Sequence, residues 1–323
     1  MTTNSEKKEI LEYNWSDLHV DQNYDFFISD ERYVDSLRKV DPSDKEIFLK
    51  HLLAIPHRDR SYSMNYKGTF FRIENVRSIS GELYSLRRMP LSVPSIHNLG
   101  YNHRFVQHIL SLSSHSGLIL WAGPTGQGKT TAISSLLTEY LNLYGGFAYT
   151  IEDPAEMPLE GEYQAFNGSI GLCKQVEVKH DDWGVELKSA LRTKPRYIFI
   201  GEIRTPDAAK ECLRASISGH LVLASIHASS IPDALSSLVK YASSDMSETA
   251  SYDILSRGIL CVVKQELSGL GERCHPVIES LFANPDLNSG CTVRSIIRSG
   301  KLNLATSIET QKIRIEKGIP LFQ

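Results

Sequence analysis

The segment from Gly123 to Thr130, Gly-Pro-Thr-Gly-Gln-Gly-Lys-Thr, restricts the possible folds of this chain more than any other feature. The pattern predicts a loop whose backbone N–H groups surround phosphates. The apolar run Gly117–Ala122 before it is typical of a strand buried on both faces, and Thr130–Leu143 after it favours a helix. Strand, glycine-rich loop and helix in this order predict an α/β nucleotide-binding fold, and the alternative is a plain glycine turn between the two elements.

The side chains of this segment have separate expected roles. Lys129 would reach the β and γ phosphates, and the Thr130 hydroxyl would ligate the Mg²⁺ that bridges them. The chain has no Asn-Lys-x-Asp segment, which a GTPase would use to recognise guanine, so ATP and Mg²⁺ are the expected cofactors. The expected nucleotide-binding residues are Gly123, Pro124, Thr125, Gly126, Gln127, Gly128, Lys129, Thr130 and Thr131.

The length of 323 residues, with 41% hydrophobic and 23% charged residues, predicts a soluble globular chain of two domains. Residues 1–90 mix short apolar runs with many charges and predict a small α+β domain. Two prolines, Pro90 and Pro94, mark residues 91–95 as a linker. Residues 96–323 alternate apolar and helical stretches, which predicts a parallel sheet with crossover helices. Further expected strands are Phe147–Ile151, Tyr197–Ile200, Leu221–Ile226 and Ile259–Gln265.

Charge and cysteine content exclude several classes of protein. The formal net charge of −3 gives no bulk attraction to nucleic acid, and no direct nucleic-acid binding is expected. The five cysteines include no Cys-x-x-Cys pair, which fits a reducing cytoplasm better than a disulfide framework. No uncharged apolar run approaches the ~20 residues that span a bilayer, so we expect no transmembrane segment and only peripheral contact with a membrane.

Two acidic residues follow expected strands, at the edge where α/β sheets bind ligands. Glu202 ends the run that begins at Tyr197, and it would organise Mg²⁺, partly through water. Glu152 ends the run that begins at Phe147, and it could polarise the attacking water as a general base. The alternative is that these acids only end strands and begin helices.

His220 and His227 flank the expected strand Leu221–Ile226. At ~3.3 Å per residue their backbones lie roughly 20 Å apart, too far to share one phosphate directly. His227 stands at the carboxyl end, where an imidazole could sense the γ-phosphate. His220 is a possible second sensor and equally well a structural histidine.

Arginines gather before the linker and again in the second domain. An arginine that reaches across a subunit boundary could stabilise the transferring phosphoryl group. For each arginine taken singly, the alternative is a solvated or salt-bridged role. The first group is Arg72, Arg77, Arg87 and Arg88, and the second is Arg192, Arg196, Arg204 and Arg214. We expect the first group to contain the trans-acting residues.

Four segments in order resemble the signature boxes of the type II/type IV secretion ATPase superfamily. They are the phosphate loop, Thr-Ile-Glu-Asp-Pro-Ala-Glu from Thr150, Gly-Glu-Ile-Arg from Gly201, and Gly-His-Leu-Val-Leu-Ala-Ser-Ile-His from Gly219. The resemblance extends upstream through Ser16–His19, Phe71–Ile73 and Leu86–Pro90. One departure is residues 224–229, where the family usually has Gly-Thr-x-His-Thr, and it concerns the polar contacts beside His227.

The resemblance implies a homohexameric ring in which a PAS-like amino-terminal domain hinges on a RecA-like ATPase domain, with nucleotide between them. It makes Glu152 the catalytic glutamate of the acidic box and Glu202 the Walker B acid. It makes His220 and His227 the histidine-box pair. It also suggests that Arg72 and Arg77, or the pair at Arg87, act as interdomain arginine fingers.

Branches of the superfamily differ in their secondary motifs. Pilus assembly and type II secretion ATPases usually carry a four-cysteine zinc module, which this chain lacks. The run Val293–Lys301 resembles the carboxyl-terminal helix of the PilT-like retraction ATPases. The runs Gln175–His180 and Ala190–Arg196 look more like the DotB and TraJ ATPases of type IVB systems, and we favour that branch.

The expected function is therefore that of a hexameric ATPase, peripheral at the cytoplasmic side of the inner membrane. It would convert ATP hydrolysis into domain motion that powers a type IVB-like secretion or conjugation machine. Its partners would be further copies of the chain and inner-membrane components of a secretion, conjugation or pilus system. The alternatives are a pilus retraction ATPase and, from a different class, a nucleotide-binding scaffold that does not hydrolyse ATP.

Overall fold

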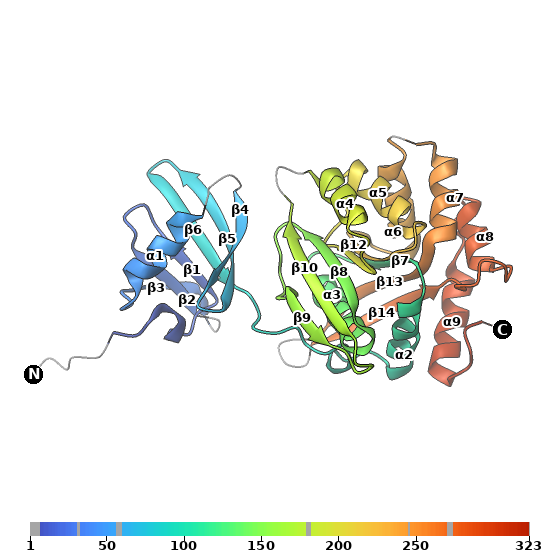
Figure 1. Ribbon diagram of the computed structural model, residues 1–323, viewed down its shortest axis with the longest axis horizontal. Helices are drawn as coiled ribbons and strands as arrows, with labels where there is room; N and C mark the ends of the chain where they lie inside the picture. Colours follow the sequence, from blue (N-terminus) through green and yellow to red (C-terminus); the bar gives the residue numbers. More distant parts are fainter. Residues whose placement is uncertain are drawn as a thin grey trace, which may run out of the picture. The chain divides into compact units, whose positions relative to one another are not determined.

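A computed structural model describes residues 7–30, 33–55, 60–178, 182–244, 246–269 and 274–322. The chain divides into two compact units (Figure 1). The first comprises Met1–Ser92 together with Asp153–Pro158, and the second comprises Val93–Glu152 and Leu159–Gln323. The chain first passes from one unit to the other between Ser92 and Val93. The sequence did not predict that residues 153–158 belong to the first unit.

The first unit is a six-stranded antiparallel sheet in the order β3-β2-β1-β6-β5-β4, with one α-helix. Phe48 of that helix is fully buried and meets the rings of Phe26, Tyr66 and Phe71 at centroid distances of 4.9 to 6.1 Å. Edge-to-face aromatic packing therefore fixes the helix on the sheet. The elements are η1 Ile10–Glu12, β1 Asp17–Val20, β2 Phe26–Asp30, β3 Tyr33–Val40, α1 Lys45–Ala54, β4 Ser61–Tyr66, β5 Thr69–Ser78 and β6 Gly81–Arg88.

The second unit contains an eight-stranded sheet in the order β14-β13-β7-β12-β11-β8-β10-β9. Six neighbouring strands, from β13 to β10, run parallel, and the edge strands β14 and β9 are antiparallel. The strands are β7 Gly117–Ala122, β8 Gly146–Glu152, β9 Gly161–Gln164, β10 Ile170–Glu177, β11 Tyr197–Ile200, β12 Leu221–Ile226, β13 Ile259–Ser268 and β14 His275–Phe282. The strands that the sequence predicted in this domain are all present.

Helices cover both faces of this sheet, which explains why β7, β11 and β12 are buried along their whole length (Figure 1). On one face α4 to α8 pack side by side, and on the other face lie α2, α3 and α9. The helices are η2 Ile96–Asn98, α2 His103–Ser111, η3 Leu112–Ser114, α3 Lys129–Tyr144, α4 Trp183–Arg192, α5 Pro206–Ser216, α6 Ile231–Ala242, α7 Glu248–Gly258, α8 Thr292–Arg298 and α9 Ala305–Lys317. Within the described part of the chain, no helix has both the length and the apolar character needed to span a bilayer.

Candidate nucleotide-binding site

The glycine-rich loop lies at the carboxyl end of β7, between that strand and α3. Gly123 has a φ of 155°, and a Cβ atom there would lie 2.3 Å from the carbonyl oxygen of Gln265. Gly128, which precedes α3, has a φ of 73°, and a Cβ atom there would lie 3.1 Å from the side-chain amide nitrogen of Gln265. Both positions therefore require glycine, because the loop is pressed against β13 and its backbone is in a region that other residues avoid.

Lys129 begins α3, and its side chain turns back over the loop. The residue is only 8% exposed, and Nζ donates hydrogen bonds to the carbonyl oxygens of Gly123 and Pro124 at 2.8 and 2.7 Å. A buried ammonium group needs such partners. The N-terminal end of α3 adds a positive field at the same place, which favours a bound anion. Thr130 and Thr131 follow in the first turn of the helix.

Glu152 is the last residue of β8 and is 2% exposed. Its Oε1 accepts hydrogen bonds from the Thr150 hydroxyl and from the Gln175 side-chain amide, both at 2.8 Å. Gln175 lies opposite Thr150 on the parallel strand β10 and also accepts the Leu159 N–H at 3.2 Å. The carboxylate is thus oriented by two strands. Sequence analysis missed both partners. A polar Thr150 within the apolar run of β8 was an available signal, whereas Gln175 lies in a strand with other polar residues and gave none.

Glu202 lies at the end of the neighbouring strand and is more open than Glu152. Two nitrogens of Arg204, Nε and Nη2, reach its Oε2 at 2.7 and 2.6 Å. The Gly201 N–H donates to the Ile151 carbonyl at 2.8 Å, and a Cβ at Gly201 would lie 3.2 Å from Glu152 Cγ. Gly201 therefore allows the two acidic strand ends to approach each other.

The two histidines lie at opposite ends of β12, as the sequence predicted. His227 is exposed and follows Ile226, which pairs with Ala122, the residue before the phosphate loop. His220 precedes the strand, and its Nδ1 lies 2.6 Å from the Pro195 carbonyl oxygen. Only His227 therefore shares an edge with the phosphate loop.

The departure from the family pattern at residues 224–229 places a serine where it can make a polar contact. The Ser225 hydroxyl donates to the Gly201 carbonyl oxygen at 2.5 Å. This bond connects the strand before His227 to the strand before Glu202. A polar contact beside the histidine is therefore present in this chain.

The three arginines expected to act in trans each face a carboxylate of the first unit. Arg72 Nη1 lies 3.2 Å from Glu156 Oε1, Arg77 Nε lies 3.8 Å from a Glu82 oxygen, and Arg87 Nε lies 2.8 Å from an Asp17 oxygen. All three side chains are substantially exposed, at 44%, 89% and 73%, so these pairs contribute little to stability. Their role towards nucleotide stays a prediction.

Arg88 differs from the other arginines of its group. Its guanidinium lies 4.5 Å from the centre of the Trp15 ring and donates to the carbonyl oxygens of Leu11 and Tyr13. These contacts give Arg88 a structural position within the first unit.

The residues expected to hold Mg²⁺ are Thr130 and Glu202. Among the described residues, no three His, Cys, Asp or Glu side chains gather into a metal site. Mg²⁺ bound with a nucleotide takes most of its ligands from phosphate oxygens and water, and needs only one or two protein groups. One hydroxyl and one carboxylate therefore fit a Mg²⁺–nucleotide complex.

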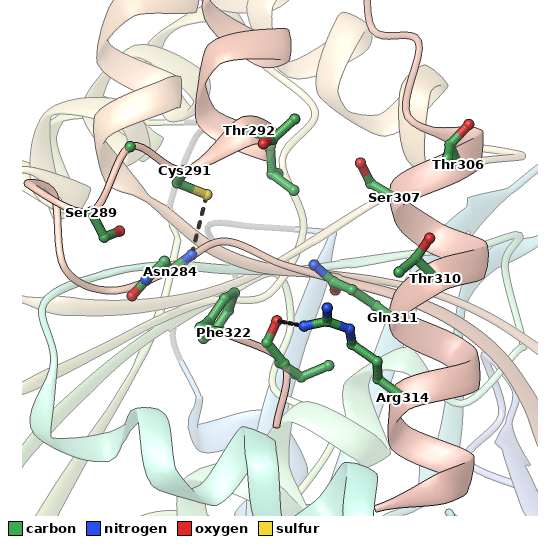
Figure 2. Close-up of a pocket in the computed structure, with 13 residues that line it drawn as sticks. Asn284, Ser289, Cys291, Thr292, Thr306, Ser307, Thr310, Gln311, Arg314 and Phe322 are labelled. Carbon is green, nitrogen blue, oxygen red and sulfur yellow. Dashed lines mark hydrogen bonds between the residues drawn. The ribbon is translucent and has the colours of Figure 1, made fainter. Parts of the chain in front are cut away.

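A separate cavity of about 330 Å³ lies between α8, α9 and the chain that follows β14 (Figure 2). Hydroxyl and amide side chains line most of it. Arg314 donates to the carbonyl oxygens of Pro320 and Leu321, both at 3.1 Å. The Gln311 side-chain amide accepts a hydrogen bond from the Phe282 N–H and donates one to the Phe282 carbonyl oxygen. None of the expected site residues lines this cavity.

The phosphate loop, the central parallel sheet and the two acids at its edge define the class of P-loop nucleotide-binding proteins. Residues 58–312 match the family model described as Type II/IV secretion system protein. Because this match covers most of the chain, the chain belongs to that family.

Among curated relatives, the competence protein ComGA of Bacillus subtilis is 28% identical over 77% of this chain and 70% of its own length. Seven further curated relatives, among them the type IV pilus ATPase PilU of Pseudomonas aeruginosa, are covered over only 28% to 66% of their lengths. The activity and partners of those whole proteins therefore enter only as support for a proposal.

Two solved structures share the fold. The pilus retraction motor PilT with bound ADP has a TM-score of 0.71 at 24% identity, covering 96% of this chain and 91% of PilT. The ATPase DotB of Legionella pneumophila has a TM-score of 0.68 at 18% identity, covering 95% of this chain and 89% of DotB. These matches confirm the predicted fold class, a small amino-terminal domain followed by a P-loop ATPase domain.

Proposed function

We propose that this chain is an ATPase that binds and hydrolyses ATP at the carboxyl edge of its parallel sheet. One observation carries the proposal. The phosphate loop, Glu152, Glu202 and His227 all lie at the carboxyl ends of parallel strands of one sheet and therefore lie along the same edge. This is the edge at which open α/β sheets bind their ligands.

Each residue has a distinct role in this reaction. Lys129 exchanges its bonds to loop carbonyls for bonds to the β and γ phosphates. Thr130 and Glu202 would hold Mg²⁺, which when bound would supply positive charge beside the phosphates. Glu152 polarises the attacking water from a carboxylate that Thr150 and Gln175 keep oriented. His227 senses the γ-phosphate, and His220, at the other end of β12, is the second candidate sensor.

The proposed assembly is a homohexameric ring, peripheral at the inner membrane. Arg72, Arg77 and Arg87 are exposed enough to reach another subunit, because surface ion pairs are readily exchanged. We place the ring in a DotB- or TraJ-like secretion or conjugation machine, on the likeness of residues 175–180 and 190–196 to that branch. Of these, Lys179 and His180 lie outside the described residues.

A second candidate function is pilus retraction. Two observations favour it: the TM-score to the retraction motor PilT, and the PilT-like run Val293–Lys301, which forms α8 and the residues after it. Deleting the gene distinguishes the two candidates. Loss of retraction leaves pili abundant, whereas loss of a secretion or conjugation motor abolishes effector or plasmid transfer.

Steady-state ATP hydrolysis by the full-length chain tests the proposal. We expect Lys129→Ala and Glu202→Gln each to lower kcat by roughly 10² or more, because each removes a group that stabilises transition-state charge. Lys240→Ala, which removes an exposed lysine near the end of α6, is the matched control and should keep full activity. An intact oligomer of the native chain that binds ADP but shows no turnover would favour the scaffold and overturn the motor.

A further inference from the structure

Gln265 is a buried polar residue in a strand that is otherwise apolar at its start. It lies in β13, after five consecutive buried residues from Ile259 to Val263, and is 2% exposed. A primary amide in such a place destabilises the fold unless its hydrogen bonds are made. The bonds of Gln265 therefore indicate why the residue is there.

All three bonds of the Gln265 side chain connect distant parts of the second unit. Oε1 accepts the Trp121 indole N–H at 2.8 Å and the Tyr101 hydroxyl at 2.6 Å. Nε2 donates to the backbone carbonyl oxygen of Gln127, in the phosphate loop, at 2.5 Å. An indole N–H can only donate and a carbonyl can only accept, so these partners fix which way the amide is turned.

The bond to Gln127 sets the direction of one peptide group in the phosphate loop. In a planar trans peptide the carbonyl and the N–H point in opposite directions. Because the Gln127 carbonyl points at β13, the N–H of Gly128 points away from β13. The Gln127 side chain reinforces this arrangement, since its Oε1 accepts the Leu267 N–H at 2.6 Å.

We infer that Gln265 is a positioning residue for nucleotide binding. It holds the Gln127–Gly128 peptide so that the Gly128 N–H is presented to the bound phosphates. Tyr101 and Trp121 hold Gln265 in place from its other side. The inference rests on the proposed function only in requiring that nucleotide phosphates bind at the loop, and it does not require hydrolysis.

Tyr101 extends this set of contacts to the start of the second unit. It lies between η2 and α2, shortly after the chain enters the unit at Val93. Its ring packs against Trp121 at 6.4 Å between centroids, and burial raises the pKa of its hydroxyl, which therefore stays protonated and donates. The hydroxyl thus connects the segment after the linker to the phosphate loop through one amide.

Calorimetric titration of the full-length chain with Mg-ADP tests the inference. We expect Gln265→Met to raise the Kd about tenfold, because the loop loses the bond that orients its peptide. The matched control is Gln311→Met. Gln311 is also buried, at 7% exposure, and its amide also makes two bonds, to Phe282 at 2.7 and 2.8 Å, but it lies in α9 at the cavity of Figure 2. The Gln311→Met variant should have a lower melting temperature than the native chain, and its Kd for Mg-ADP should stay within about twofold of the native value.

Gln265→Glu gives a readout that general destabilisation would not produce. The ionised carboxylate still accepts from Tyr101 and Trp121 but repels the Gln127 carbonyl, whereas the protonated acid can donate to it. Burial raises the pKa of such a carboxyl group. The ratio of variant to native Kd for Mg-ADP should therefore fall as the pH is lowered from 8 to 6. This variant decides the question if Gln265→Met fails to fold.

Three results would overturn the inference: native Kd values in the Gln265 variants at every pH, equal weakening by Gln311→Met, or no binding of Mg-ADP by the native chain. The last result would also contradict the proposed ATPase function. A native chain that binds Mg-ADP without hydrolysing ATP would contradict only the motor function, and the inference about Gln265 would still hold.

Discussion

The two ends of the parallel strands in the second unit use polar side chains for different purposes. At the carboxyl edge, Lys129, Glu152 and Glu202 are each held by other polar groups, on the same edge of the sheet as the phosphate loop. At the amino edge, His220 bonds the Pro195 carbonyl, and Arg196 bonds the Ser113 carbonyl at 3.1 Å. There the polar groups connect one loop to another.

The direction of the chain explains this difference. Four of the six parallel strands, β7, β10, β11 and β12, are followed by a loop and the positive N-terminal end of a helix, and these helix ends lie at the carboxyl edge. The amino edge receives helix C-terminal ends, whose carbonyl groups need donors such as arginine and histidine. Substitutions of the charged residues at the carboxyl edge should therefore lower activity, whereas substitutions at the amino edge should lower stability.

Glu152→Gln provides the strongest test of this comparison. We expect kcat for ATP hydrolysis to fall by about 10²–10⁴, because an amide cannot act as the general base. The substitution is nearly isosteric, so the melting temperature and the affinity for Mg-ADP should change little. Steady-state kinetics and calorimetry measure these quantities. A large loss of stability with unchanged kcat would assign Glu152 to the fold instead.

The histidine pair tests the two edges with one residue type. His227→Asn should lower kcat about tenfold and leave the melting temperature unchanged, because its side chain is exposed at the active edge. His220→Asn should leave kcat within about twofold and lower the free energy of unfolding by about 1 kcal/mol, since its bond to Pro195 is perturbed. Equal losses of kcat in both variants would show that His220 also acts as a sensor, and would contradict the division between an active carboxyl edge and a structural amino edge.

The sequence predicted the parts of this architecture that leave a local pattern. Apolar runs identified β7, β8, β11, β12 and β13, because strands covered on both faces contain few polar residues. The edge strands β9 and β14, and the strand β10 beside β9, were not predicted. Exposed residues alternate with buried ones over the first five residues of β10 and with half-buried ones over the first five residues of β14, so neither strand forms a long apolar run.

The charged residues of the site were predictable, but the groups that orient them were not. Lys129 belongs to a contiguous pattern, and Glu152 and Glu202 end recognisable strands. Gln265 lies 138 residues from the carbonyl it binds, and Gln175 lies 23 residues from Glu152. A single glutamine in a strand has no periodicity, so its partner is defined only when strand order and register are known.

The smallest expected effect concerns the loop that carries His227 at the active edge. Asp233 Oδ2 accepts the backbone N–H of Ser229 at 2.8 Å and its hydroxyl at 3.0 Å, while the Asp233 N–H donates to Ser230 Oγ at 3.2 Å. This reciprocal cap begins α6. The Ser229 N–H is the main reason that the pKa of Asp233 lies below its ordinary value.

Asp233→Ala should lower the free energy of unfolding by about 1 kcal/mol at pH 7, the usual cost of losing a helix cap. Because the folded pKa of Asp233 is lowered, its contribution is complete above the unfolded value of about 3.9 and is lost as the pH falls towards the folded value. Urea denaturation at pH 7 and near pH 3.5 should therefore show a smaller difference in the free energy of unfolding between variant and native chain at the lower pH.

The kcat of Asp233→Ala for ATP hydrolysis should stay within about twofold of the native value. A difference that is independent of pH would show that the cap acts without its charge, and a large loss of kcat would mean that the active edge depends on this cap as well as on its charged residues.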